Sequence, residues 1–168
     1  MVLIKSISGI RGTLENIPGE SLSDVDIIKF TLAYAHVVIL KNKSRKVIVG
    51  RDARFSGDHI SSLVSKVLLD EGINVIDIGL VTTPTLGISV KHNNCSGGIM
   101  ISASHNDEKW NALKLLSNQG EFLSPKIVNK IINNSIVRTP TKNLEKGKYT
   151  YYKSALLAYH QCPFNHHK

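Results

Sequence analysis

The segment GGIMISASHNDEKWNALKLL (residues 97–116) passes from an apolar run into a cluster of polar side chains and then into a second apolar run. GGIMIS (97–102) has the length and composition of a buried strand, and NALKLL (111–116) is typical of a strand that forms a hairpin with GEFL (120–123). Between the two runs stand four consecutive polar residues, Ser104 to Asp107. The segment therefore predicts a sheet that presents a polar loop at the end of a strand.

Apolar strands and amphipathic helices alternate on both sides of this segment. Further strands are predicted at 3–10 (entering a glycine turn at Gly9 and Gly12), 46–52 and 73–79. Helices are predicted at 58–71, from the turn at Thr83 and Pro84 to about His92, and at 124–134. Another helix begins at Ser23 and Asp26, which have the spacing of a capping box, and its expected inward stripe is Val25, Ile28, Leu32, Ala35 and Ile39. This alternation predicts an α/β fold in which helices cover a mixed β-sheet.

The last part of the chain has a different character. Residues 139–148 are polar and rich in turn formers, and predict a linker. YTYYKSALLAYH (149–160) predicts one more helix, and QCPFNHHK (161–168) has no pattern.

Composition limits the classes of partner. The 168 residues carry a net charge of +8, which suits nucleic acid, an acidic membrane surface or a phosphorylated small molecule. Neither an RNA-recognition signature nor a zinc-finger spacing is present, so we expect no nucleic-acid partner. The longest apolar run, 35–40, is too short to span a membrane. Cys95 and Cys162 lie far apart and match no metal spacing, which together with the absence of a signal-peptide pattern predicts a cytoplasmic protein.

The polar loop itself allows two kinds of chemistry. Ser104 next to His105 suggests a hydrolase, but adjacent residues seldom reach each other as nucleophile and base, and no G-x-S-x-G motif is present. The other possibility is a serine that carries a phosphoryl group, which requires an exposed hydroxyl, hydrogen-bond donors and a proton shuttle. His105, Asn106 and Lys114 are side chains of the required types.

Four motifs in order resemble those of the α-D-phosphohexomutases, the superfamily of phosphoglucosamine mutase, phosphomannomutase and phosphoglucomutase. They are SISGIRG (6–12), GRDARFSG (50–57), DIGLVTTPT (77–85) and GGIMISASHN followed by WNALK (97–114). The resemblance implies the N-terminal domain of such an enzyme, a three-layer domain over 1–138 with a mixed sheet covered by helices. Residues 139–168 would then be a linker, the start of an inter-domain helix and a tail.

The resemblance also implies roles for individual residues. Ser104 aligns with the serine that is phosphorylated and that binds Mg²⁺ through its phosphate, and Lys114 aligns with a lysine implicated as general acid and base. Arg11 aligns with an arginine near the phosphoserine, and His105 and Asn106 with loop residues that contact substrate or phosphate. Hexose phosphate and hexose bisphosphate would be the ligands, and the remaining mutase domains would be partners that supply the main Mg²⁺ ligands and read the sugar.

Other residues of the motifs are expected to have structural roles. Arg51, Asp52 and Arg54 are more readily explained as an ion-pair set than as catalytic groups. Thr82, Thr83 and Pro84 are expected to shape a turn rather than to bind ligand.

Two departures from the family pattern leave an alternative open. Asp107 stands where the family usually has proline, and its carboxylate would repel a phosphate by about 2 kcal/mol at roughly 8 Å for an effective dielectric constant near 20. No D-G-D-x-D-R motif for Mg²⁺ occurs, so we expect these residues alone to be inactive as a mutase. The alternative is a non-catalytic α/β binding or interaction module that keeps the fold.

Overall fold

The computed structural model describes residues 2–135 and 145–152. The strands are β1 (Leu3–Ser6), β2 (Gly9–Thr13), β3 (Lys46–Arg51), β4 (Asn74–Leu80), β5 (Gly97–Ile101), β6 (Trp110–Leu116) and β7 (Tyr149–Tyr151). The helices are α1 (Asp24–Tyr34), which continues as the π-helix η1 (Ala35–Ile39), α2 (Gly57–Asp70), α3 (Thr83–His92) and α4 (Pro125–Asn133).

All described strands belong to one mixed sheet, in the order β1-β2-β6-β5-β3-β4-β7. The strands β5, β3, β4 and β7 run parallel to one another, whereas β6 is antiparallel to both β5 and β2. The parallel strands place the carboxyl ends of β3, β4 and β5 at one edge of the sheet, where α/β proteins usually bind ligands.

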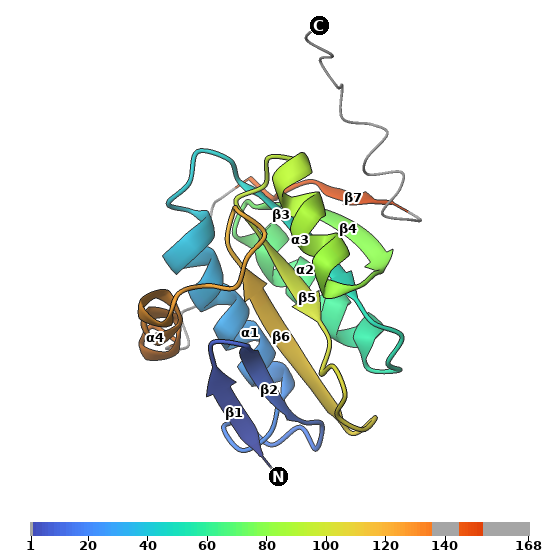
Figure 1. The fold of residues 1–168 in the computed structure, drawn as a ribbon. Helices are drawn as coiled ribbons and strands as arrows, with labels where there is room; N and C mark the ends of the chain where they lie inside the picture. The colour runs from blue at the N-terminus through green and yellow to red at the C-terminus, as the bar shows by residue number, and fades with distance from the viewer. Residues whose placement is uncertain (1, 136–144, 153–168) are drawn as a thin grey trace, which may run out of the picture.

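The sheet has helices on both faces, as Figure 1 shows. Side chains of β3 alternate between the two faces: Val47 and Val49 pack in the larger core with α1, α2 and α4, and Ile48 packs in the smaller core under α3. The same alternation puts Met100 of β5 and Leu116 of β6 on the α3 face. The prediction of a three-layer α/β domain with a mixed sheet is confirmed.

Most predicted elements lie where the sequence placed them, but the first strand does not. Instead of one strand over 3–10, β1 and β2 form a tight antiparallel hairpin in which Ser6 pairs with Gly9. Gly9 has φ +130°, a conformation that side-chain-bearing residues rarely adopt, and it begins β2. Gly12 lies within β2 rather than in a turn.

The predicted inward stripe of the first helix is wrong in part. The capping box is present, since Ser23 Oγ accepts a hydrogen bond from the Asp26 N–H at 3.2 Å. However, Val25 is 46% exposed, and Ile27, Phe30 and Tyr34 face the core instead. The helix carries apolar residues on more than one side, so periodicity alone does not determine which side the large aromatic residues occupy.

Two predictions near the end of the chain are corrected. GEFL forms no strand: Phe122 makes only an isolated bridge to Leu116. Residues 149–151 form β7 beside β4 rather than the start of a helix, because their backbone continues the parallel ladder and Tyr149 Oη donates to Asp77 Oδ2 at 2.8 Å. The rest of the predicted helix and most of the predicted linker lie outside the described residues.

Candidate active site

The candidate site lies at the sheet edge where β3, β4 and β5 end (Figure 1). β3 leads into Asp52 and Arg54, β4 leads into the amino end of α3, and β5 leads into the serine loop. By this we mean residues 102–110, which connect β5 to β6 and include the first residue of β6. Asp52 N–H donates to Ile101 O at 3.0 Å, which ties the end of β3 to the end of β5. Val81 N–H donates to Arg51 O at 3.0 Å, so the segment after β4 is held to the same two strand ends.

Ser104 is exposed and has a left-handed backbone conformation, with φ +57°. This conformation is uncommon for a residue with a Cβ, and such residues cluster at functional sites. The Ser104 N–H donates to Ser102 Oγ at 3.1 Å, and Ser104 Oγ accepts a hydrogen bond from Lys114 Nζ at 2.7 Å. The hydroxyl is therefore held by an amine, on a residue that is otherwise open to solvent.

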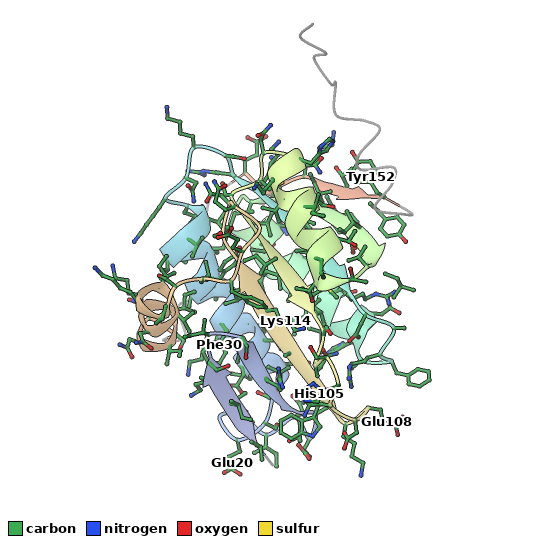
Figure 2. The ribbon with its side chains drawn as sticks, viewed as in Figure 1. Glu20, Phe30, His105, Glu108, Lys114 and Tyr152 are labelled. Carbon is green, nitrogen blue, oxygen red and sulfur yellow. The ribbon has the colours of Figure 1, made fainter. Side chains whose placement is uncertain are left out.

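Lys114 lies on β6 opposite Met100, and its side chain is on the α3 face of the sheet. Figure 2 shows it along the strand, above the loop that carries His105 and Glu108. The residue is only 7% exposed, and its Nζ also lies 3.4 Å from Thr83 Oγ1 at the start of α3. Thr83, expected only to shape a turn, therefore also contacts the site.

The surroundings of Lys114 hold its pKa below the usual value of a lysine. Burial is the largest cause, because it disfavours the charged form, and the positive charge of Arg11 is the second. Asp52 acts in the opposite direction, and Arg54 lowers the pKa further. A lysine with a lowered pKa has more neutral amine near pH 7, which is the form that can accept a proton.

Arg11 reaches the site because β2 pairs with β6, where it lies opposite Ala112. Its Nη1 donates to Asn106 Oδ1 at 2.9 Å. The structure thus brings together four of the predicted site residues, Ser104, Lys114, Arg11 and Asn106. The hairpin of β1 and β2, which the sequence did not predict, is what carries Arg11 there.

Among the described residues, no hydrogen bond joins the side chain of His105 or Asp107 to this group. His105 is exposed, and within the described part of the chain its side chain makes no hydrogen bond or ion pair. Asp107 Oδ1 accepts a hydrogen bond from the Lys109 N–H at 3.0 Å, which fixes the carboxylate to the following turn.

Arg54 is the site residue whose importance the sequence did not indicate. The predicted ion pair with Asp52 is present, with Arg54 Nε 3.2 Å from Asp52 Oδ2, whereas Arg51 pairs with Asp58 instead. The remaining Arg54 donors all go to backbone carbonyls of the serine loop: Nη2 to Ser104 at 3.0 Å and Asn106 at 2.6 Å, and Nη1 to Trp110 at 3.1 Å and to Asp107. Only contacts across the fold reveal this role.

No protein metal centre is apparent at this edge. Among residues 2–135 and 145–152, no three or more His, Cys, Asp and Glu side chains gather closely enough to hold a metal ion. In the same part of the chain, no helix has the length and apolar composition that crossing a bilayer requires.

Comparison with known proteins identifies the family. Residues 4–140 match the model of phosphoglucomutase/phosphomannomutase, alpha/beta/alpha domain I. The chain belongs to this family. The predicted superfamily, and the assignment to its first domain, are thereby confirmed.

Several relatives are mutases. Phosphoglucosamine mutase from Alkaliphilus metalliredigens is 33% identical over 155 residues, which are 90% of this chain and 34% of the relative. The phosphoglucomutase/phosphomannomutase of Thermococcus kodakarensis is 36% identical over 115 residues, covering 67% of this chain and 24% of the relative. The chain spans about a third of the length of the first of these relatives.

Solved structures agree with the fold. A putative phosphomannomutase from Thermus thermophilus superposes with a TM-score of 0.73 at 25% identity, covering 90% of this chain and 33% of that one. A phosphoglucomutase/phosphomannomutase family protein from Burkholderia thailandensis gives a TM-score of 0.68 at 20% identity, covering 90% and 34% of the two chains, and supports the fold alone.

Proposed function

We propose that this chain is the phosphoryl-carrying domain of a phosphohexomutase, which interconverts a hexose 6-phosphate and 1-phosphate through a bisphosphorylated sugar. The sugar would be glucosamine, mannose or glucose, the substrates that the names of its relatives indicate. Ser104 would hold the phosphoryl group between the two transfers. Family membership supports the reaction class, and the geometry around Ser104 supports the assignment of the residue.

The contact between Lys114 Nζ and Ser104 Oγ, at 2.7 Å, is the observation that carries the proposal. When Ser104 takes up a phosphoryl group, a bond forms between Oγ and phosphorus, the bond from phosphorus to the sugar oxygen breaks, and that oxygen gains a proton and leaves as a hydroxyl group. The hydroxyl proton must leave Oγ, and a neutral Lys114 amine at this distance can accept it. In the reverse transfer the ammonium returns the proton to Oγ as the Oγ–P bond breaks.

Arg11 and Asn106 would bind the phosphoryl group. Arg11 has a single hydrogen bond from its side chain among the described residues, to Asn106, so its other donors are available for phosphate oxygens. His105 is exposed on the same loop, in a position to contact the sugar phosphate once it is bound.

Of the residues in this chain, only phosphorylated Ser104 is proposed to bind Mg²⁺. Phosphate oxygens on Ser104 would supply one part of a coordination shell, and the ion would neutralise charge on the transferred group. The described residues do not complete such a shell. Further ligands would have to come from other mutase domains, which are the proposed partners.

The alternative of a non-catalytic binding module gains no support from the site. A module without turnover has no need of a buried lysine aimed at a strained serine, because both features cost stability. A cytoplasmic location, with neither a membrane nor a nucleic acid as partner, remains part of the proposal.

Mutase turnover tests the proposal. In the protein as its gene encodes it, Ser104→Ala should lower the conversion of hexose 1-phosphate to 6-phosphate by at least about 1000-fold, because covalent transfer is lost. Ser62→Ala, at an exposed position of α2, is the matched control and should retain most activity. Turnover of the Ser104→Ala variant close to that of the unmodified protein would refute the assignment.

A further inference from the structure

Arg54 is connected to the serine loop by more hydrogen bonds than any predicted catalytic residue. A guanidinium has five N–H donors in one plane, and the structure gives every one of them an acceptor. One acceptor is the Asp52 carboxylate and four are backbone carbonyls of the loop. All the donors of this arginine are therefore engaged within the site.

Because of its conformation, the serine loop requires a group of hydrogen-bond donors at this position. It turns sharply enough that its carbonyls at 104, 106, 107 and 110 all converge on one point. Converging carbonyl dipoles repel one another unless a cation or several donors lie between them. The Ser104 carbonyl is among them, so the same contacts hold Ser104 in its left-handed conformation.

Arg54 is itself held in place by hydrogen bonds to Asp52. Its side chain is 13% exposed, and both its Nε and its backbone N–H donate to Asp52, each at 3.2 Å. Asp52 is in turn bound through its N–H to the end of β5. The guanidinium is thus fixed relative to the sheet and not relative to the loop alone.

We propose that Arg54 is a positioning residue that holds the backbone of the serine loop so that Ser104 Oγ stays on Lys114 Nζ. This inference rests on the proposed function. It extends that function by assigning different roles to the two arginines at the site, Arg11 and Arg54. Arg54 has no donor left for a phosphate, whereas Arg11 does. Arg54 therefore acts on the transfer through the loop, and Arg11 acts on the phosphate.

A lysine cannot replace Arg54 in this role. Lysine keeps the charge, but its three donors radiate from one nitrogen and cannot reach five acceptors arranged around a plane. Arg54→Lys therefore tests the geometry of the clamp while preserving the charge. Arg51→Lys is the matched control, because Arg51 stands nearby, pairs with Asp58 and makes no side-chain hydrogen bond to the serine loop.

Two quantities are measured on each variant, made in the protein as its gene encodes it. Millisecond-to-second hydrogen exchange reports the opening of the loop, with peptides from α1 and β4 as reporters of folding. The rate of Ser104 phosphorylation by glucose 1,6-bisphosphate with Mg²⁺ reports the transfer. Arg54→Lys should raise exchange in residues 103–110 and lower the phosphorylation rate, each by about 10-fold or more, since several charge-assisted hydrogen bonds are lost. Arg51→Lys should change neither.

The outcomes separate this inference from the proposed function. Unchanged loop exchange in Arg54→Lys overturns the inference, and so does faster loop exchange with an unchanged phosphorylation rate. If the unmodified protein takes up no phosphate, the proposed function fails, and the loop exchange alone then decides whether Arg54 holds the loop. Should Arg54→Lys prove unfolded by the α1 and β4 reporters, Asp52→Asn, which removes the carboxylate that binds the guanidinium, takes its place. Loop exchange is then the sole criterion, because the loss of the Asp52 charge also lowers the pKa of Lys114.

Discussion

At the scale of single residues, the site depends on a lysine placed where a charge is unfavourable. Lys114 is buried on the α3 face of β6, near a second cation, and both features hold its pKa below that of a free lysine. The motif indicates this lysine as a site residue, whereas its position between Leu113 and Leu115 on a strand would by itself favour a side chain that points outward to solvent. The pairing of β6 with β5 determines that the Lys114 side chain lies on the α3 face of the sheet.

Charge substitutions should move the pKa of Lys114 in opposite directions. Arg11→Gln removes a positive charge, so the pKa should rise and the pH at which phosphorylation of Ser104 reaches half its maximum should rise with it. Asp52→Asn removes a negative charge, so both values should fall. The titration of the Lys114 ε-carbon, followed by NMR, measures the pKa directly. Shifts of the same sign in the two variants would contradict the electrostatic account.

Asp107 should weaken the phosphorylated state through its charge. Asp107→Asn keeps an oxygen that can accept the Lys109 N–H but removes the negative charge, so at low salt the phosphorylated fraction should rise severalfold, in line with the repulsion of about 2 kcal/mol after partial screening. The gain should shrink in high salt. Intact-mass spectrometry at both salt concentrations measures it, and an equal fraction at low salt would mean that the carboxylate faces away from the phosphate.

At the scale of elements, the helices and strands that have a clear local sequence pattern could be predicted from the sequence. The elements that depend on contacts with distant parts of the chain could not. The strands at 46–51 and 97–101, helix α2 and the proline-opened helices α3 and α4 all carry clear apolar patterns or caps. The hairpin of β1 and β2 depends on Gly9 lying against β6, and β7 depends on an edge of β4 that is free to pair. The sequence of the hairpin does not show that it will pack against β6, and the sequence of β7 does not show that it will pair with β4.

Four of the site residues could be found from the sequence, because they lie in motifs that resemble those of the phosphohexomutases. The position of Arg54 could not, since its acceptors are backbone carbonyls that carry no sequence signal. The roles of Ser104, Lys114 and Arg11 remain predictions that the geometry supports.

The close approach of β2 to β6 gives a prediction at this scale. A Cβ on Gly9 would lie 2.6 Å from Leu113 O, and the backbone there has φ +130°. Gly9→Ala should therefore cost about 2 kcal/mol or more of unfolding free energy and displace Arg11 from the site. Gly19→Ala is the matched control, with φ +82° but open space around it, and should cost only about 1 kcal/mol. Urea unfolding compares the two, and equal losses would show that the contact with β6 is unimportant.

At the scale of the whole molecule, the described residues form one sheet with a core on each face and a site at one edge. The chain matches domain I of its family and spans about a third of the length of the phosphoglucosamine mutase from Alkaliphilus metalliredigens. We expect the 168 residues alone to fold cooperatively but to show no mutase turnover, because the ligands that would complete a Mg²⁺ site are absent from the described residues. A coupled assay with several hexose phosphates, with circular dichroism as the check on folding, measures both.

The central claim is that Ser104 carries the phosphoryl group, and intact-mass spectrometry with phosphopeptide mapping tests it most directly. After incubation with glucose 1,6-bisphosphate and Mg²⁺, the protein as its gene encodes it should gain the mass of one phosphoryl group, located on Ser104 and absent from the Ser104→Ala variant. Lys114→Met should slow the gain by about 100-fold or more, the usual effect of losing a general base. A phosphoryl group located on another residue, or an equal gain in Ser104→Ala, would contradict the account.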